Sequence, residues 1–231
     1  MDDWKTKTHP RQQQQRDPSR KLPPHLENHI DDALLDVFRP MRPFLRDLGF
    51  SPDALTLLSG VFFTFSALAI FMNHFGWAAL FYGTGYAFDV FDGNFARCYG
   101  LVSSRGDFLD HWKDVIGLFV IYIVFIFNPD IPISWKVFFV LVSLCLAILT
   151  SIYFGCQEIY HHRVQGRKPK GSTFMAPFRF LCYGTKNESL EDIEKKLQIT
   201  RWTGSGTWAF FFVTFLVAIS LSFDSKMNEK N

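Results

Sequence analysis

The sequence has few cysteines, and none lies in the close pairs that metal sites use. The four are Cys98, Cys145, Cys156 and Cys182, and they contain no CxxC pair. Structural zinc sites draw on such local pairs, so we expect no zinc site. Most of the four fall inside or beside apolar runs, where a thiol behaves as a small hydrophobic side chain. We therefore expect no disulfide either.

An excess of charge of one sign is also lacking. The formal net charge is only +2, and the basic residues lie beside apolar segments rather than among exposed aromatics. This distribution argues against nucleic-acid binding. The region after Met1 has no apolar core of the signal-peptide kind, so we expect no cleavage and a cytosolic amino terminus. Residues 1–27 are polar and show no helical or strand period, which predicts a disordered tail.

Some long stretches contain no charge at all. Between Ala54 and Phe88 there is no Asp, Glu, Lys or Arg. This run is too long for one span of about 20 residues but fits two spans joined by a turn near Asn73. Further apolar runs follow, so the sequence predicts an all-α, polytopic integral membrane helical bundle within residues 51–223. The five expected spans cover residues 55–72, 77–96, 107–127, 135–157 and 202–223.

Shorter segments flank these spans. Residues 28–50 place apolar side chains at helical spacing opposite charged ones, which predicts an interfacial amphipathic helix that Pro40 and Pro43 must bend or break. Residues 172–183 are apolar but short, and are a candidate short or re-entrant sixth span. Residues 224–231 form the tail, which would lie outside with five spans and in the cytosol with six.

Carboxylates gather where the second and third expected spans meet. Asp89 and Asp92 close the second, and Asp107, Asp110 and Asp114 open the third at a spacing that puts them on one helix face. Each ionised acid deep in a membrane costs roughly 2.5 to 3.5 kcal/mol on insertion scales, so a counter-charge is needed. Mg²⁺ and Mn²⁺ prefer carboxylate oxygens, and acids on two helices suit a two-metal site.

Glycine and arginine accompany these acids. Gly93 and Gly106 leave backbone without side chains where a diphosphate could approach, and Arg97 offers a fork for a phosphate. Metals and an arginine on a diphosphate, with one carboxylate left as a base, are what phosphoryl-group transfer demands. Lys113 is expected to point away, toward lipid headgroups. An excess of Lys and Arg between Gln157 and Trp202 predicts that this end of the bundle faces the cytosol.

Together these residues form a motif, D-x2-D-G-x2-A-R-x8-G-x3-D-x3-D. Its fixed positions are Asp89, Asp92, Gly93, Ala96, Arg97, Gly106, Asp110 and Asp114. The motif resembles the complete signature of the CDP-alcohol phosphatidyltransferase family. Upstream, residues 51–56 resemble the segment that opens the first span of that family and helps to bind the CDP group.

The resemblance implies a six-span membrane homodimer with a cytosol-facing site and two divalent ions, Mg²⁺ or Mn²⁺. Asp89, Asp92 and Asp110 would hold the ions, and Asp114 would touch an ion and act as general base. The residues expected to contact the CDP donor are Asp53, Thr56, Gly93, Arg97, Ser103 and Gly106. Asp107 is expected to cap the third span, and His111 to support the site or contact the acceptor.

The implied function is a step of phospholipid biosynthesis, in which a phospho-alcohol group passes from a CDP-alcohol donor to a hydroxyl acceptor and CMP is released. The pair Asp110-His111 also resembles the aminoalcohol phosphotransferase branch, which uses CDP-choline or CDP-ethanolamine with diacylglycerol. Outside enzymes, a catalytically silent scaffold or a cation transporter stays open, because intramembrane carboxylates also mark ion pathways.

Overall fold

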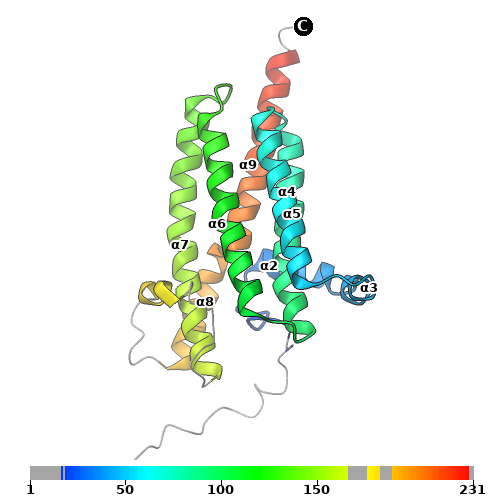
Figure 1. The fold of residues 1–231 in the computed structure, drawn as a ribbon. Helices are drawn as coiled ribbons and strands as arrows, with labels where there is room; N and C mark the ends of the chain where they lie inside the picture. The colour runs from blue at the N-terminus through cyan, green and yellow to red at the C-terminus, as the bar shows by residue number, and fades with distance from the viewer. Residues whose placement is uncertain (1–16, 18, 166–175, 183–188, 229–231) are drawn as a thin grey trace, which may run out of the picture.

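The computed structural model describes residue 17 and residues 19–165, 176–182 and 189–228. Every regular element in these ranges is a helix, which confirms the predicted all-α class. Long helices lie side by side, and shorter ones gather at one end of them (Figure 1). The elements are α2 (His29–Phe38), α3 (Met41–Asp47), α4 (Pro52–Phe71), α5 (Phe75–Cys98), α6 (Ser104–Phe127), α7 (Ile133–Gln165), η1 (Ala176–Leu181), α8 (Leu190–Thr200), η2 (Arg201–Thr203) and α9 (Ser205–Asn228).

Three helical stretches are long and apolar enough to cross a membrane. They are Pro52–Phe71, Ile133–Val164 and Leu190–Phe223. The last begins with the charged helix α8, so its apolar part is α9. Helices α5 and α6 have 24 residues each, but both carry several charged residues at one end. Large apolar side chains such as Leu57, Leu141 and Leu144 are exposed on the outer faces, as expected of a surface that meets lipid.

Local sequence signals set the ends of the long helices. The Ser51 side chain accepts a hydrogen bond from the Ala54 amide and precedes Pro52, so α4 starts with a capping residue followed by proline. Ser103 caps α6 by accepting from the Gly106 amide at 3.0 Å. Asn73 adopts a positive φ of 61°, which Asn tolerates better than most residues, and it turns the chain from α4 into α5.

Aromatic side chains fill the space between the long helices. Phe125 of α6 lies 4.6 Å from the ring of Phe139 on α7, and Phe139 lies 5.4 Å from Phe215 on α9. Tyr82 of α5 meets Phe212 of α9 edge to face at 4.6 Å. These ring pairs connect α5, α6, α7 and α9 through one buried apolar cluster.

The N-terminal segment differs from the predicted disordered tail. Residues 19–27 pack against the bundle, with Leu22 and Leu26 fully buried, whereas residues 1–16 and 18 lie outside the described part of the chain. The Tyr153 hydroxyl of α7 donates a hydrogen bond to the Leu26 carbonyl at 3.1 Å. A polar sequence without a period gave no sign of this packing, because it depends on isolated leucines that reach a partner far along the chain.

The predicted helix over residues 28–50 is interrupted, as its prolines required. Helix α2 ends at Phe38, and α3 starts at Met41, directly after Pro40. Asn28 caps α2, and its side-chain amide donates to the Arg201 carbonyl at 2.5 Å. Phe44 of α3 and Leu48, which directly follows this helix, are exposed, so an apolar surface here is not covered by the described residues.

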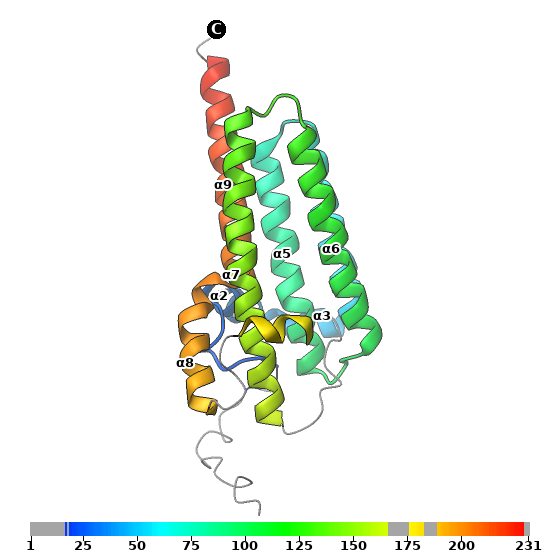
Figure 2. The ribbon, with the colours of Figure 1, turned by 90° about the vertical axis from the view of Figure 1, so that its left-hand side faces the viewer.

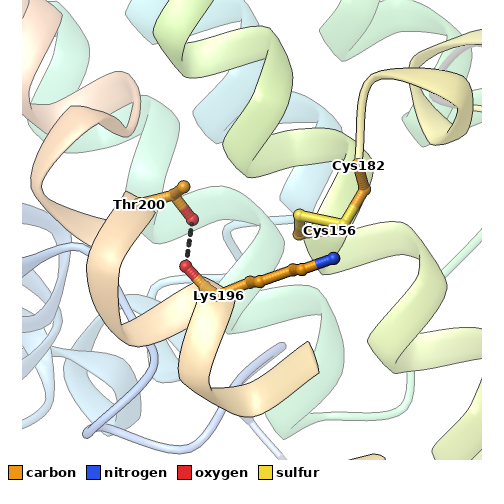
Figure 3. The surroundings of a disulfide bond; sticks show 4 residues. All are labelled: Cys156, Cys182, Lys196 and Thr200. Atoms are coloured by element: carbon orange, nitrogen blue, oxygen red, sulfur yellow. Dashed lines mark hydrogen bonds between the residues drawn. A yellow bond between two sulfur atoms is a disulfide. The ribbon is translucent and has the colours of Figure 1, made fainter. Parts of the chain in front are cut away.

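The expectation of no disulfide is wrong. Cys156 near the end of α7 is bonded to Cys182, which follows η1 (Figure 3). Gly155 makes this approach possible, because a Cβ at that position would collide with the backbone oxygen of Phe178. The two cysteines are 26 residues apart, and only the folding of η1 back onto α7 brings them together. Local cysteine spacing therefore could not reveal the pair.

Between α7 and α9, the residues that the structure describes form short helices and no helix long enough to be a sixth span. Of residues 172–183, the structure describes 176–182, and η1 occupies most of them. Helix α8 was not predicted, although Ser189 and Asp192 form a reciprocal capping box at its start and Ile193 is buried against α7. Both η1 and α8 lie beside the same end of α7 (Figure 2). Residues 224–228, expected in the tail, continue helix α9.

Candidate active site

Three carboxylates converge between the end of α5 and the start of α6. Asp89 and Asp92 belong to α5 and Asp110 to α6, and one oxygen from each can be chosen so that all three lie within 4.8 Å of one another. The helical period predicted that these acids would share a small volume. Three oxygens at this separation fit a hard divalent cation such as Mg²⁺ or Mn²⁺, which takes oxygen ligands.

Asp92 is the most buried acid of the group, and α4 holds it in place. Its residue surface is only 4% exposed, and the Thr56 hydroxyl donates a hydrogen bond to its Oδ2 at 2.5 Å. A buried carboxylate needs such a donor, since leaving it unpaired would be costly. Thr56 was predicted to contact the donor nucleotide, and the structure shows it orienting Asp92.

Lys113 lies at the centre of the acids, so the expectation that it points away is wrong. Its ammonium contacts the Asp89 carboxylate and lies 3.1 Å from Asp110 Oδ1 and 3.2 Å from Asp114 Oδ1. On a helix, a residue three positions after Asp110 is displaced from it by only about 60° around the axis. This spacing was a local signal for the contact between Lys113 and Asp110, and the prediction for Lys113 did not take it into account.

Asp114 stands apart from the three converging acids. Its side chain is 48% exposed, compared with 18% for Asp89 and 32% for Asp110, and its link to the group runs through Lys113. An exposed carboxylate next to a cation-binding group can reach a substrate hydroxyl. This geometry suits the acceptance of a proton.

Arg97 and Gly93 lie next to each other on the last turns of α5. A Cβ on Gly93 would be 3.2 Å from Nη1 of Arg97, so the glycine leaves room for the guanidinium. The Nε of Arg97 donates to the Ser19 carbonyl at 2.9 Å, and the Asn94 side chain donates to the same oxygen at 2.9 Å. Ser19 and Asn94 were not expected near the site, and a contact across so much sequence has no local signal.

The remaining expected donor contacts meet beside the start of α6. A Cβ on Gly106 would be 3.1 Å from Oδ1 of Asp53 and 3.2 Å from the Ser103 hydroxyl. Gly106 therefore permits a close approach of α4 and α6 at this point. Asp53, Ser103 and Gly106 line one side of the helix ends that carry the acids.

Asp107 and His111 form a local pair on α6. Asp107 lies in the first turn, where an acid is favourable, and its side chain is 44% exposed. Nδ1 of His111 lies 2.6 Å from the Asp107 carbonyl oxygen, which orients the ring along the helix. The cap of α6 is Ser103, so the expectation that Asp107 caps this helix is wrong.

The sequence profile of the CDP-alcohol phosphatidyltransferase family matches residues 50–220, which is more than half of the chain and includes every acid of the site. The chain belongs to the CDP-alcohol phosphatidyltransferase family. Membership implies a membrane-bound transferase of phospholipid biosynthesis that uses a CDP-alcohol donor and a hydroxyl acceptor, and this family generally uses divalent metal ions. No curated protein and no solved structure gives a significant match.

Proposed function

We propose that this family member transfers a phospho-alcohol group from a CDP-linked donor to the hydroxyl of an acceptor and releases CMP. Asp89, Asp92, Asp110 and Asp114 would hold two divalent ions, Mg²⁺ or Mn²⁺, and Asp114 would act as general base. The observation that carries the proposal is the convergence of three carboxylate oxygens within 4.8 Å, inside the region that matches the family. When bound, the ions would offset the negative charge of the donor diphosphate.

In the proposed reaction, individual side chains have separate roles. Asp114 takes the proton of the acceptor hydroxyl, whose oxygen then attacks the β-phosphorus of the donor. The bond from that phosphorus to the bridging oxygen breaks, and CMP leaves with the bonding electrons. Arg97 binds a phosphate oxygen through its terminal amino groups beside Gly93, and Thr56 keeps Asp92 oriented.

The donor site would lie over the ends of α4, α5 and α6. We assign donor contacts to Asp53, Thr56, Gly93, Arg97, Ser103 and Gly106. Thr56 bonds to Asp92, Gly93 and Arg97 follow Asp92 on α5, and the other three meet at the start of α6, about one turn before Asp110. We assign Asp107 and His111 as supporting or acceptor-contacting residues, because they form a local pair on α6 beside Asp110.

We further propose a setting in the membrane with five spans, α4, α5, α6, α7 and α9. Helices α2 and α3 would lie in the interface, where the exposed Phe44 and Leu48 meet lipid. The loop after α7 is rich in Lys and Arg, which favours a cytosolic position for the site. The family resemblance supports a homodimer.

Release of CMP tests the activity directly. Detergent-purified protein would be assayed with Mg²⁺ or Mn²⁺, using CDP-diacylglycerol, CDP-choline and CDP-ethanolamine as donors against a panel of hydroxyl acceptors that includes diacylglycerol. We expect CMP from one donor and acceptor pair, loss of activity with EDTA, and loss in Asp92→Asn. Asp47→Asn serves as the control, because Asp47 is exposed at the end of α3 and is not one of the converging acids.

Turnover of an aminoalcohol donor with diacylglycerol would identify the aminoalcohol branch, and turnover of CDP-diacylglycerol would exclude it as the main activity. If folded protein that binds metal releases no CMP with any pair, the transferase proposal is wrong for this chain. A catalytically silent scaffold or a cation carrier would then explain the acids.

A further inference from the structure

Lys113 occupies the space between acids that are candidate metal ligands. Its ammonium bonds to Asp89 and approaches one oxygen each of Asp110 and Asp114 at 3.1 and 3.2 Å. The side chain is only 10% exposed. Asp89 and Asp110 also belong to the three acids whose oxygens converge within 4.8 Å. One amine therefore uses carboxylates that a divalent ion would need.

A slot on α4 fixes the path of this lysine. A Cβ on Gly60 would be 3.4 Å from Cγ of Lys113, so the stem crosses α4 where α4 has no side chain. The ammonium also lies 5.7 Å from the centre of the Phe63 ring, one turn further along α4. The lysine is thus seated by packing as well as by charge, unlike a surface lysine that samples many rotamers.

Charge explains why such a residue is useful. Lys113 contacts Asp89, Asp110 and Asp114, and Asp92 lies with the first two in the converging group. Like charges at this range repel one another, most strongly where burial limits screening by water, as at Asp92. Lys113 supplies a cation that the chain carries itself. An ammonium in contact with Asp89 and Asp110 and a divalent ion bound to the same two carboxylates would repel each other, so each weakens the binding of the other.

We propose that Lys113 is a built-in competitor of the divalent ions. Its ammonium neutralises the acids until metal binds, and it then withdraws along the Gly60 slot. This inference rests on the metal dependence in the proposed function. Its consequence is a weakened apparent metal affinity: if the amine holds the acids about nine-tenths of the time, the affinity falls about tenfold.

Binding of Mn²⁺ to the purified full-length protein tests this role without any substrate. Isothermal titration would compare wild type with Lys113→Met, which keeps the length of the stem and removes the charge. We expect about tenfold tighter Mn²⁺ binding by Lys113→Met, and binding close to wild type by Lys113→Arg. Lys195→Met is the matched control, because Lys195 forms an exposed ion pair with Glu191 on α8.

Thermal unfolding gives a second readout. In EDTA, Lys113→Met leaves the acids without their counter-charge and is expected to unfold at a lower temperature than wild type. Saturating Mn²⁺ should remove this difference, so that the stabilisation by metal is larger in the variant. A role limited to packing would not produce this dependence on metal.

Equal Mn²⁺ affinities and equal stabilisation by metal in wild type and Lys113→Met would overturn the competitor role, while leaving the transferase proposal in place. Weaker Mn²⁺ binding by Lys113→Met would also overturn the competitor role, since the lysine would then contribute to metal binding. If neither protein binds Mn²⁺ or Mg²⁺, both this inference and the metal dependence of the proposed function are wrong.

Discussion

Lys113 contacts three acids, Asp89, Asp110 and Asp114, and Asp114 has the most exposed side chain of the three. As a general base it is expected to accelerate the reaction, so Asp114→Asn should lower kcat by about a hundredfold to ten-thousandfold. Because Asp89, Asp92 and Asp110 already converge without it, metal binding should persist. CMP release and Mn²⁺ titration on the same preparation measure the two properties.

The exposed Asp47→Asn change serves as the control for this prediction, and Asp89→Asn provides the contrast. Asp89→Asn should weaken metal binding as well as transfer, because Asp89 is one of the three converging acids. If Asp114→Asn releases CMP at the wild-type rate, Asp114 is not the general base.

At the scale of residues, spacing predicted contacts along a helix but not contacts between distant segments. The convergence of Asp89, Asp92 and Asp110 follows from two short acidic patterns at adjacent span ends, so it could be predicted. The place of Lys113 could also have been derived from its spacing to Asp110. The bond from Arg97 to the Ser19 carbonyl could not, because no periodic signal connects these positions.

At the scale of elements, one buried acid couples α2 to the bundle. Asp31 is 7% exposed, and it accepts hydrogen bonds from the Tyr86 hydroxyl of α5 at 2.5 Å and from Ser205 of α9 at 3.3 Å. Burial raises the pKa of Asp31 to about 6, and the hydrogen bonds oppose that rise only in part. The docking of α2 should therefore depend on pH.

Since the pKa of Asp31 is higher in the folded than in the unfolded protein, folding is favoured where Asp31 is protonated. This contribution is complete below pH 3.8 and is lost as pH rises through about 6. Between pH 5 and 7.5 the loss is about 1 kcal/mol. Thermal unfolding in detergent should show a smaller fall in stability over this range for Asp31→Asn than for wild type.

Asp36→Asn is the matched control, because Asp36 lies on the same helix with its side chain 59% exposed. It should retain the wild-type pH dependence. An Asp31→Asn protein that loses stability between pH 5 and 7.5 as steeply as wild type would show that Asp31 does not couple α2 docking to pH.

Helix boundaries were easier to predict than helix partners. Ser51 with Pro52, and Ser103 with Gly106, mark the starts of α4 and α6 through local hydrogen bonds. The disulfide between Cys156 and Cys182 and the helix α8 were missed. Cys182 and α8 belong to the region after α7, which was interpreted for its side of the membrane and for a short or re-entrant span but not for contacts with α7.

At the scale of the whole molecule, η1 and α8 lie at the end of the bundle where α5 ends and α6 begins (Figure 2), and the disulfide joins α7 to the residue that follows η1. Disulfides are rare in the reducing cytosol, where thiols are kept reduced. The basic loop nevertheless favours that compartment for this end. The proposed orientation therefore implies that Cys156 and Cys182 are reduced in the cell, although they are close enough to bond on purification.

The number of spans also determines on which side of the membrane each end of the bundle lies. The C-terminal end of α9 lies at the opposite end of the bundle from α2, α3 and α8 (Figure 1), as an odd number of spans requires. Cys98, a free exposed thiol, marks the site end, and Ser225→Cys places a thiol at the other end of α9. With Cys145 replaced by Ser, a membrane-impermeant maleimide should label these positions from opposite sides of sealed vesicles. Labelling of both from the same side would require an additional crossing and would exclude five spans.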